Sequence, residues 1–295
     1  MVCYSFSAWE FLVFAIQYHF ETFLVKVIYF WELKMKILSL GAGVQSSTLA
    51  LMAEHGEIEK PDYAIFADTG WEPKHCYDWL DFLATKLSFP VIRVSVGNIK
   101  DDLISNIKSG DRFASIPFFT ASGGMGRRQC TKEYKLVPIY KKCRELLDYK
   151  PRQRIPSGSV LMSIGISIDE AHRMKPSRER WIQNIYPLLD LRMSRNDCLS
   201  WMEHRGFPLP PKSSCIGCPF HSDSYWSDLK INHPESYTEA IQVDALLREN
   251  GRRKGMKHQE FMHPSLRPLS EIVFSSENQF EIDLFGMECE GFCGV

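Results

Sequence analysis

Short apolar runs alternate with segments of helical spacing through the first two thirds of the chain. The runs that predict buried strands are residues 36–40, 63–67, 91–95 and 160–166. The segments whose apolar residues recur at the spacing of a helix are 75–87, 99–107 and 132–147. Strands that alternate with helices are typical of right-handed βαβ units. We therefore expect an α/β fold with a mainly parallel sheet, and one more helix after Ser194.

The first strand ends in small residues. Gly41-Ala42-Gly43 follows it, and Ser46 and Ser47 then open a helix. A strand that turns through small residues into a helix presents free backbone N–H groups and the positive end of the helix dipole, which together suit an anion. A phosphate site is one interpretation of this turn. The other is an ordinary tight turn in which small residues allow close packing.

The second strand also ends in a polar loop, Asp68-Thr69-Gly70. The carboxyl ends of parallel strands meet at one edge of a sheet, and ligands bind there in open α/β folds. The two loops together therefore predict a nucleotide cleft. A helix N-cap is an alternative role for Asp68.

The overall charge gives no reason to expect a polyanionic partner, because the 295 residues carry a formal net charge of −1. The charge is uneven, however. Residues 125–180 hold 14 Lys or Arg against 6 Asp or Glu, a local excess of eight positive charges. This segment suits an anionic ligand, or else forms a solvated basic face. A hydrophobic content of 44% and a charged content of 24% are typical of a globular protein without stable membrane association.

The first 34 residues do not fit the rest of the chain. Residues 11–31 are aromatic and apolar, but Gln17, His19, Glu21 and Lys26 interrupt them. This pattern is poor for a membrane span, and it lacks the basic start and cleavage site of a signal peptide. We expect the native protein to start at Met35 and residues 1–34 to lie outside the fold. An amphipathic or membrane-associated helix is the alternative.

Nine cysteines, an odd number without a secretory signal, favour a reducing cytoplasm and metal or redox chemistry. Cys215-Ile-Gly-Cys218-Pro219 is the sharpest local motif, because two cysteines three apart around a glycine turn can bind one metal ion or cluster. A redox dithiol and a pair of buried thiols are the alternatives. Further ligands are available from Cys130, Cys289 and Cys293 or, for zinc, from His221 and His263; the remaining cysteines suit packing: Cys3, Cys76, Cys143 and Cys198.

The order of these motifs resembles the phosphoadenosine phosphosulfate (PAPS) reductase family of the PP-loop, or adenine nucleotide α-hydrolase-like, superfamily. The matching pieces are the Gly-x-Gly-x-Gln-Ser-Ser turn, Asp-Thr-Gly, Arg-x-Cys-x4-Lys-x2-Pro and Cys-x2-Cys-Pro. The resemblance covers residues 36–295. It implies a Rossmann-like three-layer α/β/α fold with a cysteine-rich C-terminal extension. The residues it assigns to the adenine nucleotide are Gly41, Gly43, Gln45, Ser46, Ser47, Asp68, Thr69 and Gly70.

The same resemblance implies a 4Fe-4S cluster, with zinc as the alternative, held by Cys130, Cys215, Cys218 and Cys289. It assigns catalysis to Cys293 or Cys289, whose thiolate would attack sulfur, and to Arg128 and Lys135, which would contact substrate phosphates. Positive charge also lowers the pKa of a thiol. Two departures stand out. Gln45 replaces the acidic residue of the PP-loop, which disfavours ATP pyrophosphatase activity, and Cys130 is followed by Thr131 rather than a second cysteine.

We therefore expect a PAPS reductase-like enzyme that uses PAPS, adenylyl sulfate or ATP in sulfur transfer or reduction, with a thioredoxin-like protein as thiol reductant. One alternative is an ATP-dependent sulfurtransferase that modifies tRNA or DNA, as in DNA phosphorothioation. Another is a nucleotide- or nucleic-acid-binding module with structural zinc and no turnover. We expect a nucleotide-binding domain over residues 35–205 and a cysteine-rich region over residues 206–295.

Overall fold

The computed structural model describes residues 34–109, 116–249 and 258–274. Its centre is a five-stranded sheet in which every neighbouring pair is parallel. The strands, in spatial order, are β3 (Val91–Ser95), β2 (Tyr63–Asp68), β1 (Met35–Leu40), β5 (Val160–Ile164) and β6 (Ile182–Ile185). The predicted α/β fold with a mainly parallel sheet is confirmed.

The first strand, β1, lies at the centre of the sheet. β1 pairs with β2 on one side, Ile37 opposite Tyr63, and with β5 on the other, Ile37 opposite Met162. The strand order therefore reverses direction between β1 and β5. In open parallel sheets, ligands bind at the carboxyl ends of the strands beside such a reversal.

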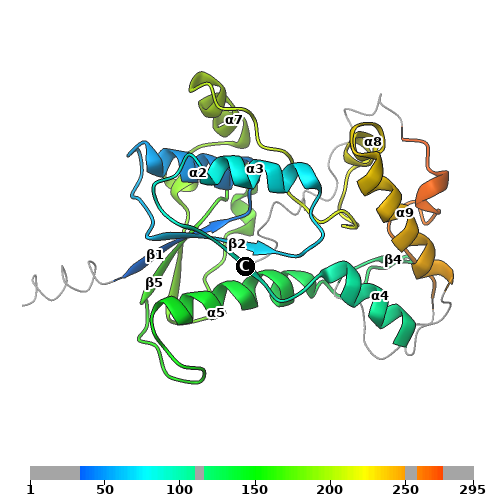
Figure 1. Cartoon of the computed structure of the whole chain (residues 1–295), viewed down its shortest axis with the longest axis horizontal. Helices are drawn as coiled ribbons and strands as arrows, with labels where there is room; N and C mark the ends of the chain where they lie inside the picture. Colours follow the sequence, from blue (N-terminus) through cyan, green and yellow to red (C-terminus); the bar gives the residue numbers. More distant parts are fainter. Residues whose placement is uncertain (1–33, 110–115, 250–257, 275–295) are drawn as a thin grey trace, which may run out of the picture.

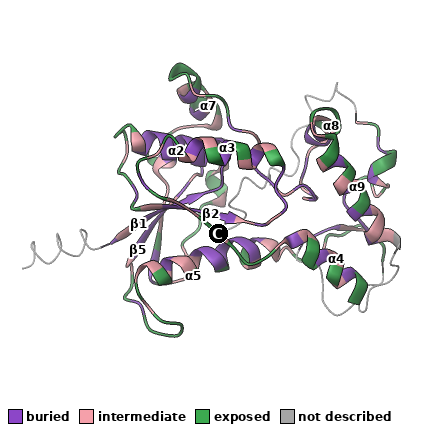
Figure 2. Cartoon of the chain, in the orientation of Figure 1, coloured by how far each residue is buried: buried purple, intermediate pink, exposed green. Residues whose placement is uncertain are grey.

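Helices lie on both sides of the sheet in Figure 1: α2 (Val44–Glu54) and α3 (Lys74–Ala84) on one side and α5 (Val137–Leu146) on the other. α7 (Arg195–His204) packs against α2. Two separate hydrophobic clusters correspond to these two sides. In Figure 2 the sheet is largely buried and the outer faces of the helices are exposed.

The C-terminal helices build a third cluster beyond the edge of the sheet. They are α8 (Asp223–Asn232) and α9 (Pro234–Glu249), and they share this cluster with α4 (Ile99–Ser109). Beside them, β4 (Phe119–Thr120) pairs antiparallel with β7 (Glu260–Phe261). Residues on both sides of the expected boundary at 205 therefore share one core, and the division into two domains stays a prediction.

Four short helical segments complete the described elements: the π-helix η1 (Thr131–Leu136), η2 (Ile168–Arg173), α6 (Pro187–Asp190) and η3 (Leu269–Glu271). The strands predicted from apolar runs and the helices predicted from spacing are all present within a few residues of their expected bounds. The expected helix after Ser194 is α7, and Ser194 and Asp197 form a capping box at its start.

None of the helices in the described ranges combines the length and apolarity that crossing a membrane needs. The expectations for residues 1–33, and for Cys289 and Cys293, lie outside the described residues.

Candidate functional site

The turn between β1 and α2 is held by its own residues. Ala42, rather than either glycine, has a left-handed backbone, with φ of 59°. The Ser46 hydroxyl accepts a hydrogen bond from the Gly41 amide at 3.1 Å and lies 3.4 Å from the Gly43 carbonyl, to which it donates. Gly43 caps the helix without a side chain. Three of the predicted nucleotide-binding residues thus shape the helix start that would face a phosphate.

Two other residues of this group are engaged inside the protein. Ser47 is fully buried, and its hydroxyl accepts a hydrogen bond from the Trp79 indole at 3.0 Å. Gln45 is 2% exposed; its amide oxygen accepts from Arg195 at 3.2 Å and its amide nitrogen donates to Glu170 at 3.4 Å. A nucleotide contact by either side chain stays a prediction.

The loop after β2 is ordered by Asp68. Its carboxylate accepts hydrogen bonds from the Gly70 amide and the Tyr77 hydroxyl, each at 2.8 Å. The N-cap of α3 is Pro73, so the alternative that Asp68 caps this helix is wrong. Gly70 has a φ of +73°, the left-handed region that favours glycine.

This loop also contacts the Cys215–Cys218 motif. The Thr69 hydroxyl lies 3.1 Å from Cys215 Sγ, and the Trp71 carbonyl accepts a hydrogen bond from the Ile216 amide at 2.8 Å. The Trp71 ring covers Gly217 so closely that a Cβ there would lie 2.1 Å from it. The loop predicted to bind a nucleotide and the motif predicted to bind a metal or cluster are therefore in direct contact.

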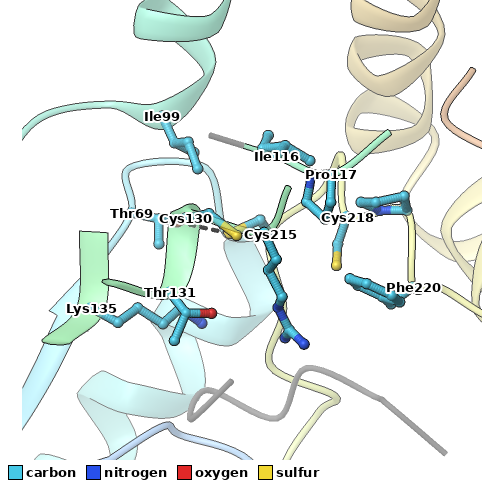
Figure 3. Close-up of a pocket in the computed structure, with 12 residues that line it drawn as sticks. Thr69, Ile99, Ile116, Pro117, Cys130, Thr131, Lys135, Cys215, Cys218 and Phe220 are labelled. Atoms are coloured by element: carbon cyan, nitrogen blue, oxygen red, sulfur yellow. Dashed lines mark hydrogen bonds between the residues drawn. The ribbon is translucent and has the colours of Figure 1, made fainter. Parts of the chain in front are cut away.

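Cys130, Cys215 and Cys218 line one pocket together with Arg128 and Lys135 (Figure 3). The three cysteines come from two segments that lie 85 residues apart in the sequence, one with Cys130 and one with Cys215 and Cys218, and all are free thiols. The Arg128 guanidinium stacks over the Phe220 ring, with 4.8 Å between the guanidinium carbon and the ring centre. The structure thus brings together the described candidate metal ligands and both described candidate catalytic residues.

The π-helix η1 forms part of the pocket wall. Pro138, just after it, explains why this helix is wider than an α-helix. In a regular α-helix the Pro138 ring would clash with the carbonyl four residues earlier. The wider turn avoids this, because the Val137 amide bonds to the Lys132 carbonyl, five residues back. Thr131 and Lys135, at the two ends of this turn, both line the pocket. The proline of the Arg-x-Cys-x4-Lys-x2-Pro motif therefore helps to shape the site.

Glu72 is a buried carboxylate beside the pocket that the sequence analysis missed. It is 6% exposed, and its Oε1 lies 3.3 Å from the Thr69 hydroxyl and 3.6 Å from Cys215 Sγ. Its Oε2 is buried without a hydrogen-bond partner among the described residues. Burial raises the pKa of Glu72. Burial alone would lower the pKa of Lys135, but Glu72 and the pocket thiols act against it and raise that pKa.

The two thiols of the motif are neutral in this environment. Burial raises the pKa of Cys218 to about 11, and it raises the pKa of Cys215 well above its ordinary value. Metal ligands must be thiolates, and the positive charges of Arg128 and Lys135 favour that form. The donor chemistry therefore suits a thiolate-bound metal. Among the described residues, however, no three His, Cys, Asp or Glu side chains lie together closely enough to hold a metal ion.

The two histidines considered for zinc point elsewhere. His221 Nε2 lies 2.9 Å from the Cys215 carbonyl oxygen, and burial lowers the pKa of His221 well below its ordinary value. His263 lies between Asp223 and Ser265, at 2.8 Å from each. Neither lines the pocket. The cysteines assigned to packing within the described residues are confirmed as buried: Cys76, Cys143 and Cys198.

Sequence reasoning also missed Trp71 and Arg195. Trp71 and Glu72 directly follow Asp68-Thr69-Gly70, and a large apolar residue with a carboxylate beside a predicted site was a usable signal. Arg195 gave no such signal, because its partner Gln45 is 150 residues away.

In comparisons with known proteins, no family model matches this chain, and no curated protein matches it.

Proposed function

We propose that this chain is a PAPS reductase-like enzyme that binds an adenine nucleotide and catalyses sulfur transfer or reduction. One observation carries the proposal: the Asp68-Thr69-Gly70 loop contacts Cys215 directly, through the Thr69 hydroxyl at 3.1 Å. A nucleotide held by this loop would lie next to three thiols and two cationic side chains. Sulfur chemistry on a nucleotide anion needs those groups in one place.

The finer architecture belongs to this proposal. The strand order β3-β2-β1-β5-β6 and the helices on both sides of the sheet are what a Rossmann-like three-layer α/β/α fold would have. A cysteine-rich extension over residues 206–295 would add the motif at Cys215 and Cys218 and the cysteines of the tail. A cytoplasmic location is also part of the proposal, since free thiols persist in a reducing compartment.

Within this proposal each residue has a chemical role. The start of α2 and the loop after β2 would bind the phosphates and the nucleoside. Arg128 and Lys135 would neutralise the charge on the transferred group and on an attacking thiolate. The attack would come from Cys289 or Cys293, forming a bond to sulfur as the bond between sulfur and the nucleotide breaks. A thioredoxin-like dithiol would supply the two electrons that release the product.

A 4Fe-4S cluster is the metal centre we propose, with zinc as the alternative. Cys130, Cys215 and Cys218 would hold it, with Cys289 as fourth ligand. Thiolate ligation suits both metals, and only the iron–sulfur cluster adds redox chemistry. The support for this metal centre is that Cys130, Cys215 and Cys218 all line one pocket.

The visible spectrum, iron and sulfide content of anaerobically purified protein test this proposal. We expect a broad band near 400 nm, roughly where thiolate-ligated clusters absorb, that is lost in Cys215→Ser. Cys143→Ser is the matched control, because Cys143 is buried on α5 away from the pocket. That variant should keep the band.

Nucleotide binding is tested on the same samples by calorimetry with PAPS, adenylyl sulfate and ATP. Stoichiometric zinc without iron would overturn the cluster and favour a binding module. Binding of none of the three nucleotides would overturn the enzyme assignment itself. ATP–pyrophosphate exchange that depends on tRNA or DNA would instead support the ATP-dependent sulfurtransferase.

A further inference from the structure

A group of exposed cations lies at the amino-terminal edge of the sheet, away from the pocket. One loop joins α5 to β5 and another joins η2 to β6, and both run directly into strands. Figure 2 shows the loop after α5 as largely exposed. We call five exposed cations of these two loops the basic surface: Lys150, Arg152, Arg154, Arg178 and Arg180. The exposed Lys175 of the second loop is not included, because its carbonyl accepts a hydrogen bond from Asn184, toward the other end of β6, at 3.0 Å.

The two loops lie side by side, so their charges belong to one surface. The Gly158 amide donates to the Arg180 carbonyl at 3.0 Å. Arg144 bridges the loops: it donates to the Gln153 carbonyl at 2.7 Å, and its guanidinium lies 5.7 Å from the centre of the Trp181 ring. These contacts fix the backbone from which the five cations project.

The basic surface is not neutralised by neighbouring carboxylates. None of its five cations forms an ion pair with a described residue. Two carboxylates lie within the same loops, Asp148 and Glu179, and Glu179 accepts a hydrogen bond from the Trp181 indole at 2.9 Å. Five cations against two carboxylates leave three excess positive charges, on a chain whose net charge is −1. By contrast, Arg93 and Arg205 pair with Asp81 and Glu57.

We propose that the basic surface binds the phosphodiester backbone of double-stranded nucleic acid. Four of its five cations are arginines, whose planar guanidinium matches phosphate oxygens. Single strands are usually bound by exposed aromatic rings on which bases stack. Here the Trp181 ring is buried, at 6% exposure, beneath Arg144, and Tyr149 of the first loop packs against the hydrophobic cluster under α5. Contacts to backbone phosphate without base stacking are those of a duplex.

The position of the basic surface sets its role. The strands run from this edge toward the pocket, so a duplex bound here does not occupy the space beside Thr69 and Cys215. The surface therefore anchors the protein on nucleic acid and takes no part in the chemistry. The inference does not depend on the function proposed for the pocket.

Salt-dependent binding of the full chain to a short DNA duplex tests the inference, with an RNA duplex of the same sequence as a second arm. Five phosphate contacts give a log–log salt slope of about −4.5, so affinity should fall about 500-fold between about 50 and about 200 mM salt. In Arg152→Gln/Arg178→Gln/Arg180→Gln, two contacts remain, and the fall should be about 12-fold. The duplex that the protein binds more tightly, DNA or RNA, identifies the nucleic acid.

The matched control is Arg93→Gln/Arg205→Gln/Arg267→Gln, which removes the same charge from exposed arginines outside the basic surface. It should keep the wild-type slope. Equal slopes in the two triple variants would overturn the inference, as would the absence of duplex binding at the lower salt concentration. Binding to phosphatidylserine vesicles without duplex binding would overturn it in favour of a membrane. Thermal melts of each variant confirm that it is folded.

Discussion

The Trp71 ring lies directly over the backbone of Gly217. The ring is 2% exposed and occupies the space where any other residue would place a Cβ. Gly217 does not have a left-handed backbone, so its role is to admit the ring rather than to provide an unusual conformation. The glycine of the Cys-x2-Cys motif is therefore a packing residue.

We predict that Gly217→Ala destabilises the protein by about 1–3 kcal/mol, the usual cost of overpacking a buried site. The cause is the 2.1 Å approach of the new Cβ to the Trp71 ring. Urea denaturation measures the change. Gly124→Ala is the control, because the nearest atom to its Cβ is the Thr120 hydroxyl oxygen at 3.6 Å. Equal losses in the two variants would contradict the packing role.

The buried thiol of Cys143 should make the free energy of unfolding depend on pH above pH 9. Burial raises the pKa of this thiol from 9.0 to about 12. Below pH 9 the thiol is protonated in both the folded and the unfolded state; above it, only the unfolded chain releases the proton, so stability is lost as pH rises toward 12. The stability advantage of wild type over Cys143→Ala should shrink by about 1.4 kcal/mol per pH unit above pH 9. A difference in free energy of unfolding that is constant with pH would refute this.

At the scale of elements, the close approach of β5 to α2 positions the predicted phosphate site. Gly165 follows β5, and a Cβ there would lie 2.8 Å from the Ser46 backbone nitrogen in the first turn of α2. Small residues on both elements therefore fix where the helix start lies. A nucleotide that binds this helix start depends on that placement.

We predict that Gly165→Ala weakens nucleotide binding at least about tenfold, the effect of about 1.4 kcal/mol, because the added methyl group displaces the start of α2. Calorimetry with PAPS, adenylyl sulfate and ATP measures it, and thermal melting shows whether the variant is folded. Gly124→Ala again serves as the control. Wild-type affinity in a folded Gly165→Ala protein would exclude α2 as the phosphate site.

The elements predicted from the sequence are those whose pattern reflects local burial. β1 and β5 are mostly apolar and were predicted, whereas two of the four residues of β6, Gln183 and Asn184, are polar, and this strand was not predicted. In α8, the apolar residue Ile231 is 72% exposed, so the pattern does not follow one buried face.

At the site, too, the sequence predicts only what depends on neighbouring residues in the chain. The spacing of Cys215 and Cys218 indicates a pair of thiols from local sequence alone. The position of Glu72 beside Asp68-Thr69-Gly70 was a usable signal, but its contact with Cys215, 143 positions away, could not be read from the local sequence.

At the scale of the whole molecule, the C-terminal helices complete a core that begins in the first half of the chain. Ile99, Leu103 and Ile107 on α4 are at most 4% exposed, and they belong to the cluster that contains Trp226 and Leu229 of α8. Removing the C-terminal region would leave this apolar face of α4 in water.

We therefore predict that a fragment of residues 35–205 does not melt cooperatively and binds a hydrophobic dye such as anilinonaphthalene sulfonate. The full chain should melt cooperatively and should not bind the dye. Dye fluorescence and a thermal melt by circular dichroism make the comparison. A fragment that melts as sharply as the full chain, without binding dye, would instead establish residues 35–205 as an independent domain.

The distance in sequence between the pocket walls has a consequence for biosynthesis. A nascent chain that has emerged as far as α5 already holds Thr69, Cys130 and Lys135, but not the two cysteines that lie 146 and more residues after Thr69. The three cysteines line one pocket only after that long loop has closed. The pocket therefore cannot form until residues 215–218 have left the ribosome, and a chain that stalls before residue 215 lacks one of its walls.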